Sequence, residues 1–440
     1  MLASGFAVGG QPTGARAAVP AAPPPSAAEP VVPADPNALS DEMMAGLISE
    51  ERTLAERLLR EFPDRPEPML WMGDLHRRRG RSAQAVEYWQ KALEQAPDMP
   101  DVYEALGQVA FEKEDCHQAV AMWEKAISIQ PSRVGLRTRL ATALVDLGRH
   151  DEAIKVLEEE LKLAPRSVPA LYLKGRLHLQ IQQYEKAASC YEQVLAEQPD
   201  HTNACYGLAT VYGRLKQSDK ATRYMELFRK YSARDADLTR TRDEVGKDAY
   251  RVPRELAALA ASAAQLYQAA GNTNAAEVLL RRALQLQPQN PLYHQRLAWI
   301  CRNTGRSGES LSLLERARDL APTNPFSHLN VAEELARQGR FADAEAVYQK
   351  AISLAPKGAV GYRELARMYL RRGQRLSAAL SLAQIAADLG GGAEDFFVLG
   401  WACDVNGDRV AAIDAIRRAI EQAPDNPKYR RMYEQLTAKK

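Results

Sequence analysis

The sequence lacks the features that mark most metalloproteins, hydrolases and membrane proteins. Its 5 cysteines form no CxxC pair, and an odd number of widely spaced thiols argues against a disulfide framework and against a zinc site. HExxH, P-loop and GxSxG motifs are missing. No apolar run approaches the roughly 18 residues that a membrane helix needs. We therefore expect no enzyme, no cofactor, no metal site and no transmembrane span.

An excess of charge of one sign is also lacking. The formal net charge is +2, with 58 Lys and Arg against 56 Asp and Glu. A nucleic-acid-binding domain usually carries a strongly basic patch or stripe. Helical repeats that read one base each would also need polar pairs at fixed positions, and such pairs do not recur along the first half of the chain. We expect no nucleic-acid partner.

The sequence does contain an internal repeat. Prolines return at a spacing of 34 residues over most of the chain, at Pro63, Pro97, Pro131, Pro165, Pro199, Pro288, Pro322, Pro356 and Pro424. A fixed period of this length is typical of stacked supersecondary units rather than of one globular core. A solenoid of this kind binds something, but the period alone does not name the ligand.

The residues between the prolines define the repeat. With each proline at position 32, ten repeats begin at Pro66, Pro100, Val134, Val168, Thr202, Ala257, Pro291, Pro325, Ala359 and Ala393. Position 8 is Gly or Ala in all ten, and position 20 is Ala in nine and Ser in one. Small residues at fixed positions let two helices pack closely. Position 15 is Gly in seven repeats, which suits a left-handed helix end. Each repeat is predicted to be helix A, a tight turn and helix B.

This pattern resembles the tetratricopeptide repeat (TPR) family, from Pro66 to Pro424. The resemblance implies an all-α, right-handed α-solenoid of about ten helix-turn-helix repeats with a capping helix at either end. It also implies a non-catalytic scaffold or adaptor that binds protein or peptide segments in its concave groove. The alternative is a subunit of a larger secretion, envelope-assembly or glycosyltransferase complex whose catalytic part lies on another chain.

The period predicts how the chain is divided. From Pro199 to Pro288 is 89 residues, which is two periods plus 21. We expect a disordered Ala/Pro-rich segment at 1–39, a capping helix at 40–65, a first array at 66–233, a charged insertion at 234–256, a second array at 257–424 and a capping helix at 425–440. The insertion is either a tolerated surface loop or a joint between two arrays with separate grooves, and Pro253 should break or begin a helix there.

The N-terminal segment bears on location. The run from Leu2 to Val8 has no preceding Lys or Arg and is short for a secretory signal. An Ala/Pro-rich spacer is common after such signals. The run could be the tail of a longer signal that begins upstream of Met1. We therefore expect export from a bacterial cytoplasm to the periplasm, and the alternative is a cytoplasmic protein.

The candidate site lies in the second array. In the TPR family, positions 2, 5, 9, 12 and 13 usually line the groove, and here helix A of the last four repeats is rich in Arg and aromatic residues near them. The candidate groove residues are Arg296, Trp299, Arg302, Phe326, Asn330, Arg337, Arg363, Arg367, Arg371, Phe397 and Trp401. They predict an extended, acidic peptide partner with an apolar anchor. The alternative is a solvated face on which Glu333, Glu364 and Asp404 pair with the arginines.

The insertion at 234–256 gives a first prediction. Because it breaks the period and is rich in charge, we expect it to be the first internal site cut by a protease after the N-terminal segment. Limited proteolysis with mass analysis of the fragments measures this. A chain that loses only its N-terminal segment would indicate one continuous, well-packed array.

Overall fold

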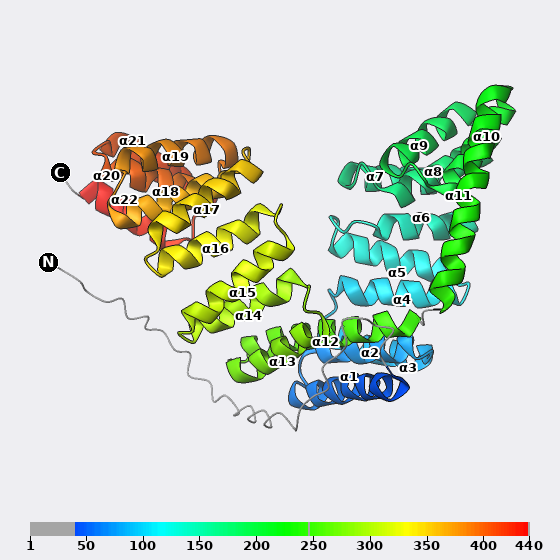
Figure 1. The fold of residues 1–440 in the computed structure, drawn as a ribbon, viewed down its shortest axis with the longest axis horizontal. Helices are drawn as coiled ribbons and strands as arrows, with labels where there is room; N and C mark the ends of the chain where they lie inside the picture. The colour runs from blue at the N-terminus through cyan, green and yellow to red at the C-terminus, as the bar shows by residue number, and fades with distance from the viewer. Residues whose placement is uncertain (1–39, 245–246, 439–440) are drawn as a thin grey trace. The chain divides into compact units, whose positions relative to one another are not determined.

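Every regular element in the described chain is an α-helix. The computed structural model describes residues 40–244 and 247–438, and these ranges hold 22 helices and no strand (Figure 1). They divide into two compact lobes, which we call the N-terminal lobe, residues 40–259, and the C-terminal lobe, residues 260–438. The division falls inside one helix, α12 (Lys247–Ala269).

The first eleven helices belong to the N-terminal lobe. They are α1 (Asp41–Glu61), α2 (Pro66–Arg78), α3 (Ser82–Gln95), α4 (Pro100–Glu112), α5 (Cys116–Ile129), α6 (Leu136–Asp146), α7 (His150–Leu163), α8 (Val168–Gln180), α9 (Tyr184–Glu197), α10 (Thr202–Arg214) and α11 (Ser218–Glu244).

The last ten helices belong to the C-terminal lobe. They are α13 (Thr273–Leu286), α14 (Pro291–Asn303), α15 (Ser307–Leu320), α16 (Pro325–Arg337), α17 (Phe341–Leu354), α18 (Ala359–Arg372), α19 (Leu376–Gly390), α20 (Ala393–Val405), α21 (Arg409–Gln422) and α22 (Pro427–Ala438).

The helices follow the predicted phase. From α2 to α21, each even-numbered helix is helix A of a repeat and the following odd-numbered helix is helix B. Helix A begins at the predicted first residue in all repeats except the third and the sixth. The predicted fold class, an all-α solenoid of helix-turn-helix repeats, is confirmed. None of the described helices is both long enough and apolar enough to cross a membrane.

The third repeat starts late for a local reason. Gly135 adopts a left-handed backbone conformation with φ of 89°, and α6 begins only after it. The carboxylate of Glu160, which is fully buried at a position that is usually small in this family, accepts a hydrogen bond from the Gly135 N–H. A buried carboxylate needs such a donor, and the Gly135 N–H satisfies one of the two oxygens, whereas Oε2 has no hydrogen-bond partner among the described residues.

The close contact between helices A and B rests on position 8. A Cβ added to Gly73 would lie 2.3 Å from Nε1 of Trp89, and one added to Gly107 would lie 2.5 Å from Nε1 of Trp123. Both tryptophans occupy position 24 and are buried. The Trp123 indole N–H also donates to the backbone carbonyl of Glu104 across 3.2 Å. In these two repeats, the aromatic ring of helix B therefore occupies the space that a side chain at position 8 would need.

The turn after helix A has the same conformation in every repeat. Position 15 has a positive φ in all ten, including the three repeats in which it is not Gly: Glu114 (63°), Gln182 (60°) and Lys216 (59°). A left-handed conformation is unfavourable for residues with a side chain, by roughly 1–2 kcal/mol. Packing of the two helices therefore sets this backbone conformation, and Gly merely makes it easier.

The insertion is largely helical in the described residues. Residues 234–244 extend α11, and residues 247–256 form the start of α12. Pro253 lies inside α12 rather than at its start, so the expectation that it breaks or begins a helix is wrong. It deprives the helix of one backbone hydrogen bond, but its neighbours Val252 and Leu256 are buried, which offsets the loss. The side chains of 236–250 lie outside the described residues.

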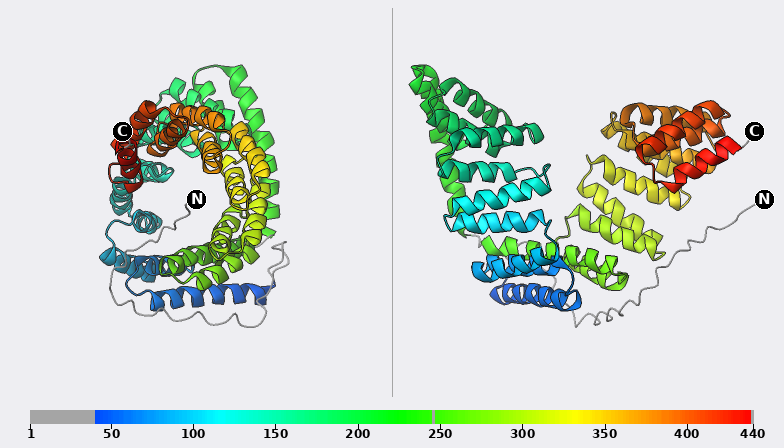
Figure 2. Two further views of the ribbon diagram at one scale, coloured as in Figure 1. Left: turned by 90° about the vertical axis from the view of Figure 1, so that its left-hand side faces the viewer. Right: turned by 180° about the vertical axis from the view of Figure 1, so that it is seen from behind.

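The start of α12 lies beside the beginning of the first array. Arg78 of α2 pairs with Glu51 of α1 and with Glu255 of α12, where Nε of Arg78 and Oε2 of Glu255 are 3.0 Å apart. Figure 2 shows this part of α12 next to α2 within the N-terminal lobe. The extra residues thus bring the chain back from the fifth repeat to the first.

A helix covers each end of the repeats. The hydroxyl of Ser40 accepts a hydrogen bond from the Met43 N–H at the start of α1, a standard N-cap. At the other end, Tyr429 of α22 is buried and stacks on Phe397 with ring centroids 5.2 Å apart. Terminal helices of this kind hide apolar surface that the end repeats would otherwise expose. The predicted segment 1–39 lies outside the described residues.

Filling position 8 should disrupt the contact between helices. We expect Gly107→Ala to cost about 1–3 kcal/mol, because its Cβ overlaps Trp123, and Gly107→Leu to cost at least as much. Gly213→Ala is the matched control, since Gly213 is also helical and a Cβ added to it would have no neighbouring atom within 4 Å. The control should be neutral or stabilising. Thermal melting measures both, and equal melting temperatures for Gly107→Ala and the parent protein would contradict the packing described above.

Removing Arg78 should give a pH-dependent loss of stability. Burial raises the pKa of Glu51 despite the pairing with Arg78. A raised pKa means that the charged form is penalised in the fold, so stability is lost as the pH rises through that pKa. We expect Arg78→Met to cost about 3–5 kcal/mol at neutral pH, and less at an acidic pH at which Glu51 is protonated.

Melting temperatures of parent and variant at the two pH values measure this difference. The double variant Glu51→Gln/Arg78→Met is the control: it lacks the Glu51 carboxyl group, so any pH dependence that it keeps comes from other groups such as Glu255, the second partner of Arg78. An equal loss at both pH values in Arg78→Met would show that Glu51 does not respond to the missing partner.

Candidate functional site

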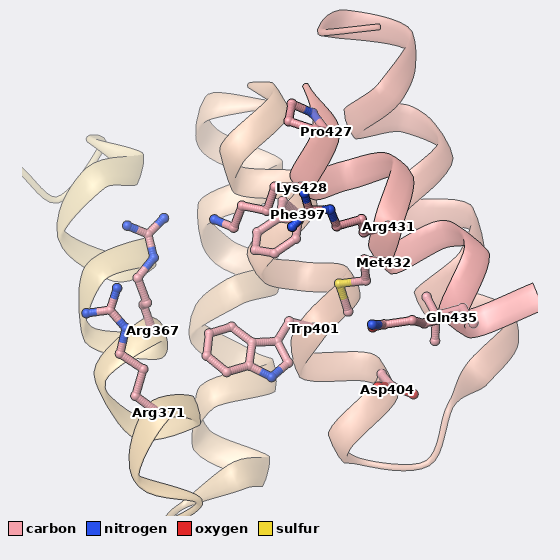
Figure 3. Close-up of a pocket in the computed structure, with 11 residues that line it drawn as sticks. Arg367, Arg371, Phe397, Trp401, Asp404, Pro427, Lys428, Arg431, Met432 and Gln435 are labelled. Carbon is pink, nitrogen blue, oxygen red and sulfur yellow. The ribbon is translucent and has the colours of Figure 1, made fainter. Parts of the chain in front are cut away.

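A pocket lies over α20 in the C-terminal lobe, between α18 and α22 (Figure 3). Its volume is about 610 Å³. It is lined by Arg367, Arg371, Phe397, Trp401, Asp404, Pro427, Lys428, Arg431, Met432, Gln435 and Leu436. Four of the candidate groove residues meet here: two arginines of the ninth repeat and two aromatic residues of the tenth.

The floor of the pocket is aromatic. Phe397 and Trp401 occupy positions 5 and 9 of helix α20, one turn apart, so both rings face the same side. Figure 3 shows them between the arginines of α18 and the side chains of α22. Nζ of Lys428 lies 3.9 Å from the centre of the Phe397 ring, a cation–π contact. Trp401 is only half-buried, which leaves part of its ring open to a ligand.

Two of the three candidate arginines on α18 serve the fold. Arg363 donates to Glu364 and to Asp395, with 2.9 Å between its Nη1 and Oδ1 of Asp395. Arg367 pairs with Glu364 and with Glu394. Burial lowers the pKa of Arg363, but the hydrogen bonds to its two carboxylates outweigh burial and raise the pKa overall. These arginines hold helix A of the ninth repeat to helix A of the tenth.

The third arginine is free. Arg371 is exposed and has no ion pair or hydrogen bond to any of the described residues. The same holds for Arg431, which projects from α22 on the other side of the pocket. Asp404 is the single acidic residue in the pocket lining. The pocket therefore presents two unpaired guanidinium groups, one on each side of Trp401.

Lys428 belongs to a network at the pocket edge. Its Nζ and the hydroxyl of Tyr429 both contact Glu394, at 3.2 Å and 2.6 Å. Burial and the hydrogen bond to Glu394 raise the pKa of Tyr429 to about 12, so its hydroxyl remains a donor at neutral pH. Burial raises the pKa of Glu394, but Tyr429, Lys428 and Arg367 outweigh it and lower the pKa overall. The network fixes α22 against α20.

A smaller pocket continues from the first towards α16. Its volume is about 300 Å³, and it shares Arg367 and Arg371 with the larger pocket. On its far side lie Glu333 and Arg337 of α16, whose charged atoms are 2.8 Å apart. The two pockets thus form one groove across α16, α18, α20 and α22.

The remaining candidate residues lie outside the larger pocket. Arg296 donates to the backbone carbonyl of Ala261 at 3.2 Å, and Arg302 lies 3.9 Å from Glu333. Trp299 and Phe326 are exposed, and Asn330 is half-buried. Arg337 lines the smaller pocket, whereas Arg363 lines neither. The alternative of a salt-bridged face therefore describes four of the six candidate arginines, but not Arg296 or Arg371.

The contribution of α22 to the groove was not predicted from the sequence. Pro427 stands 34 residues after Ala393, so α22 has the phase of helix A of an eleventh repeat. Lys428, Arg431 and Gln435 then fall at positions 2, 5 and 9, which are groove positions. Continuing the repeat by one period would have found them.

The N-terminal lobe has a pocket of its own. It has a volume of about 330 Å³ and is lined by Leu70, Trp71, Asp74, Arg77, Asp101, Glu104, Ala105, Gln108, Arg133 and Arg139. Arg133 pairs with Asp101 and Glu104, and Arg139 pairs with Glu104. Burial raises the pKa of Asp74 to about 6. Acidic and basic residues are balanced here, so this pocket shows no preference for ligands of one charge.

Comparison with known proteins identifies the type of repeat. Two sequence models described as "Tetratricopeptide repeat" match residues 66–109 and residues 172–230, 262–325 and 330–394. A third, described as "Anaphase-promoting complex, cyclosome, subunit 3", matches residues 114–194. No curated protein matches the chain.

Three of the solved structures that the chain resembles have low sequence identity to it. Yeast Tom70 is 17% identical, with 85% of this chain and 95% of that chain covered and a TM-score of 0.38. TTC0263 of Thermus thermophilus is 24% identical, with 43% and 99% covered and a TM-score of 0.35. YrrB is 22% identical, with 40% and 91% covered and a TM-score of 0.37.

The assignment rests on the sequence models and on the phase of the helices. The two tetratricopeptide models together match more than half of the chain. The described helices follow the 34-residue period that the prolines define. The chain belongs to the tetratricopeptide repeat family.

Proposed function

We propose that this protein is a non-catalytic adaptor whose C-terminal lobe binds an acidic peptide segment with an apolar anchor. The groove over α18, α20 and α22 is the proposed site. TPR proteins are in general protein–protein interaction scaffolds, which supports the class of function. The observation that carries the specific proposal is the pair of free guanidinium groups, Arg371 and Arg431, on either side of the half-open Trp401.

The residue types favour a peptide ligand. Trp and Arg are among the residues that contribute most to binding energy when they lie in a pocket that excludes water. A pocket of about 610 Å³ falls within the usual size range of ligand sites, roughly 300–1,000 Å³. An apolar side chain placed on Trp401 and Met432 would be shielded from water on both sides. This arrangement suits an aromatic or aliphatic anchor residue.

The charges favour an acidic ligand. Lys428 and Arg367 already pair with Glu394, so they offer little further attraction. Arg371 and Arg431 have no such partner, and a ligand carboxylate would form a charge-assisted hydrogen bond with either. Asp404 would oppose an acidic group placed directly beside it, so the anchor rather than a carboxylate should occupy that end of the pocket.

Charge reversal at Arg371 tests the proposal. Partners are first captured with the intact protein and identified. We then expect Arg371→Glu to weaken the binding of the captured partner by at least about tenfold. The melting temperature should not change, because Arg371 makes no ion pair that the substitution would break. Arg367→Glu is less informative, since it would also break the pairs with Glu364 and Glu394.

Arg417→Glu is the matched control. Arg417 is exposed on α21, helix B of the tenth repeat, and lines neither pocket of the groove. It changes the net charge equally, so unequal effects of the two variants separate local contact from long-range attraction. Parent-like affinity in both Arg371→Glu and Trp401→Ala would show that the partner binds elsewhere.

A further inference from the structure

We infer that the groove binds two different segments of a single ligand: an apolar segment over α14 and α16, and an acidic segment over α18 to α22. This inference rests on the proposed function, because the acidic segment occupies the site described above. It adds a second contact surface, formed by Leu292, Trp299 and Phe326, which we call the apolar stripe. The ligand would then be an extended peptide with its apolar and acidic residues in separate segments.

The apolar stripe is exposed at groove positions. Leu292, Trp299 and Phe326 keep 46%, 49% and 58% of their surface exposed. Leu292 and Phe326 are at position 2 of the seventh and eighth repeats, and Trp299 is at position 9 of the seventh. Positions 2 and 9 are those that Lys428 and Trp401 occupy around the larger pocket. Large exposed side chains at equivalent positions of adjacent repeats indicate a surface that a partner covers.

Charges near the apolar stripe are already satisfied. Arg302 and Arg337 both pair with Glu333, at 3.9 Å and 2.8 Å. Arg296 donates to the carbonyl of Ala261. An acidic residue placed here would compete with Glu333 instead of meeting a free cation. This half of the groove therefore favours apolar residues of the ligand over acidic ones.

The other half of the groove has the opposite character. Arg371 and Arg431 are exposed and unpaired among the described residues, and the aromatic floor between them is partly covered. Along the groove, the unpaired arginines therefore lie on α18 and α22, and the exposed aromatic side chains Trp299 and Phe326 lie on α14 and α16. This separation of charge from apolar surface is the reason to assign two different segments to the ligand.

The two halves are connected. The smaller pocket joins Glu333 and Arg337 of α16 to Arg371 of α18, and Phe326 lies two helical turns before Glu333 on α16. Gln295 of α14 and Ser327 of α16 are 3.5 Å apart, so these helices are also neighbours. A peptide could follow the groove from α14 to α22 without leaving the surface of the lobe.

Helix spacing gives the separation of the two segments. Packed helix axes lie about 8–10 Å apart, and an extended chain advances about 3.3 Å per residue. From α16 to α20 is two such steps, and from α14 to α20 is three. The centres of the apolar and acidic segments should therefore lie roughly five to nine residues apart.

Selection from a displayed peptide library tests this on the full chain. The probes are random peptides of about 16 residues, which span roughly 50 Å when extended. We expect peptides selected on the parent protein to combine an apolar and an acidic segment at the stated separation. Selection on Trp299→Ala/Phe326→Ala should keep only the acidic segment. Selection on Arg371→Glu/Arg431→Glu should lose it.

Binding of one selected peptide gives the quantitative test. We expect each double variant to weaken its affinity at least about tenfold, and a peptide shortened to its acidic segment to be insensitive to Trp299→Ala/Phe326→Ala. Val410→Ala is the matched control, because Val410 is 82% exposed on α21 and lies outside both pockets. Unchanged melting temperatures in all variants establish that the loss is one of binding.

The outcomes separate the inference from the proposed function. If the selected peptides are acidic throughout, or if they bind Trp299→Ala/Phe326→Ala as tightly as the parent protein, the bipartite ligand is overturned but the acidic site remains. If they bind Arg371→Glu/Arg431→Glu as tightly as the parent protein, both the inference and the proposed function are overturned. Self-association of the parent protein that Trp299→Ala/Phe326→Ala abolishes would assign the apolar stripe to a second copy of the chain, which also overturns the inference.

Discussion

The contact between position 8 of helix A and position 24 of helix B determines how each repeat is built. In the first two repeats a glycine backbone lies against a buried tryptophan ring, and any side chain at that glycine would overlap the ring. In the tenth repeat Ile416 packs against Gly400 in the same way. This contact fixes the distance between the two helices and their rotation about their own axes. Because the rotation is the same in each repeat, positions 2, 5, 9 and 13 of successive A helices face one side. The groove is a consequence of that packing.

The charges on this side divide into those that join repeats and those that remain available. Arg363 reaches Asp395 and Arg367 reaches Glu394, so both pairs link the ninth repeat to the tenth. Arg302 reaches Glu333 in the same manner between the seventh and eighth repeats. Pairs that are partly buried lose hydration as they form and stabilise a fold only modestly, but they fix the relative register of neighbouring helices. Arg371 has the same helical spacing from Arg367 as Arg367 has from Arg363, yet no acidic residue of the next repeat meets it. An arginine in the groove is therefore available to a ligand only where the next repeat offers it no acidic partner.

The sequence was sufficient for the repeat phase because the small positions and the prolines recur in almost every repeat. It could not predict the left-handed turns at Glu114, Gln182 and Lys216, since those residues carry no sign of that conformation and adopt it because the helices on either side require it. Nor could it predict that α12 continues through Pro253, because burial of Val252 and Leu256 compensates there for a lost hydrogen bond. At the candidate groove, residue type and spacing indicated the A helices of the last four repeats as a candidate site, but pairing between repeats depends on side-chain geometry. For that reason Arg363 and Arg371 were indistinguishable in the sequence and differ in the structure.

Helix α22 continues the phase of the repeats and forms one wall of the larger pocket. Helix α22 keeps the phase of the period, with Tyr429 and Leu436 buried against the tenth repeat, but no helix B follows it within the described residues. Its positions 2, 5 and 9 still face the groove, so it supplies a wall of Lys428, Arg431 and Gln435 beside Trp401. The same helix thus covers the apolar end of the solenoid and deepens the groove. A capping helix that keeps the repeat phase can therefore also belong to a binding site. One of its faces covers the apolar surface of the neighbouring repeat, and the other faces the groove.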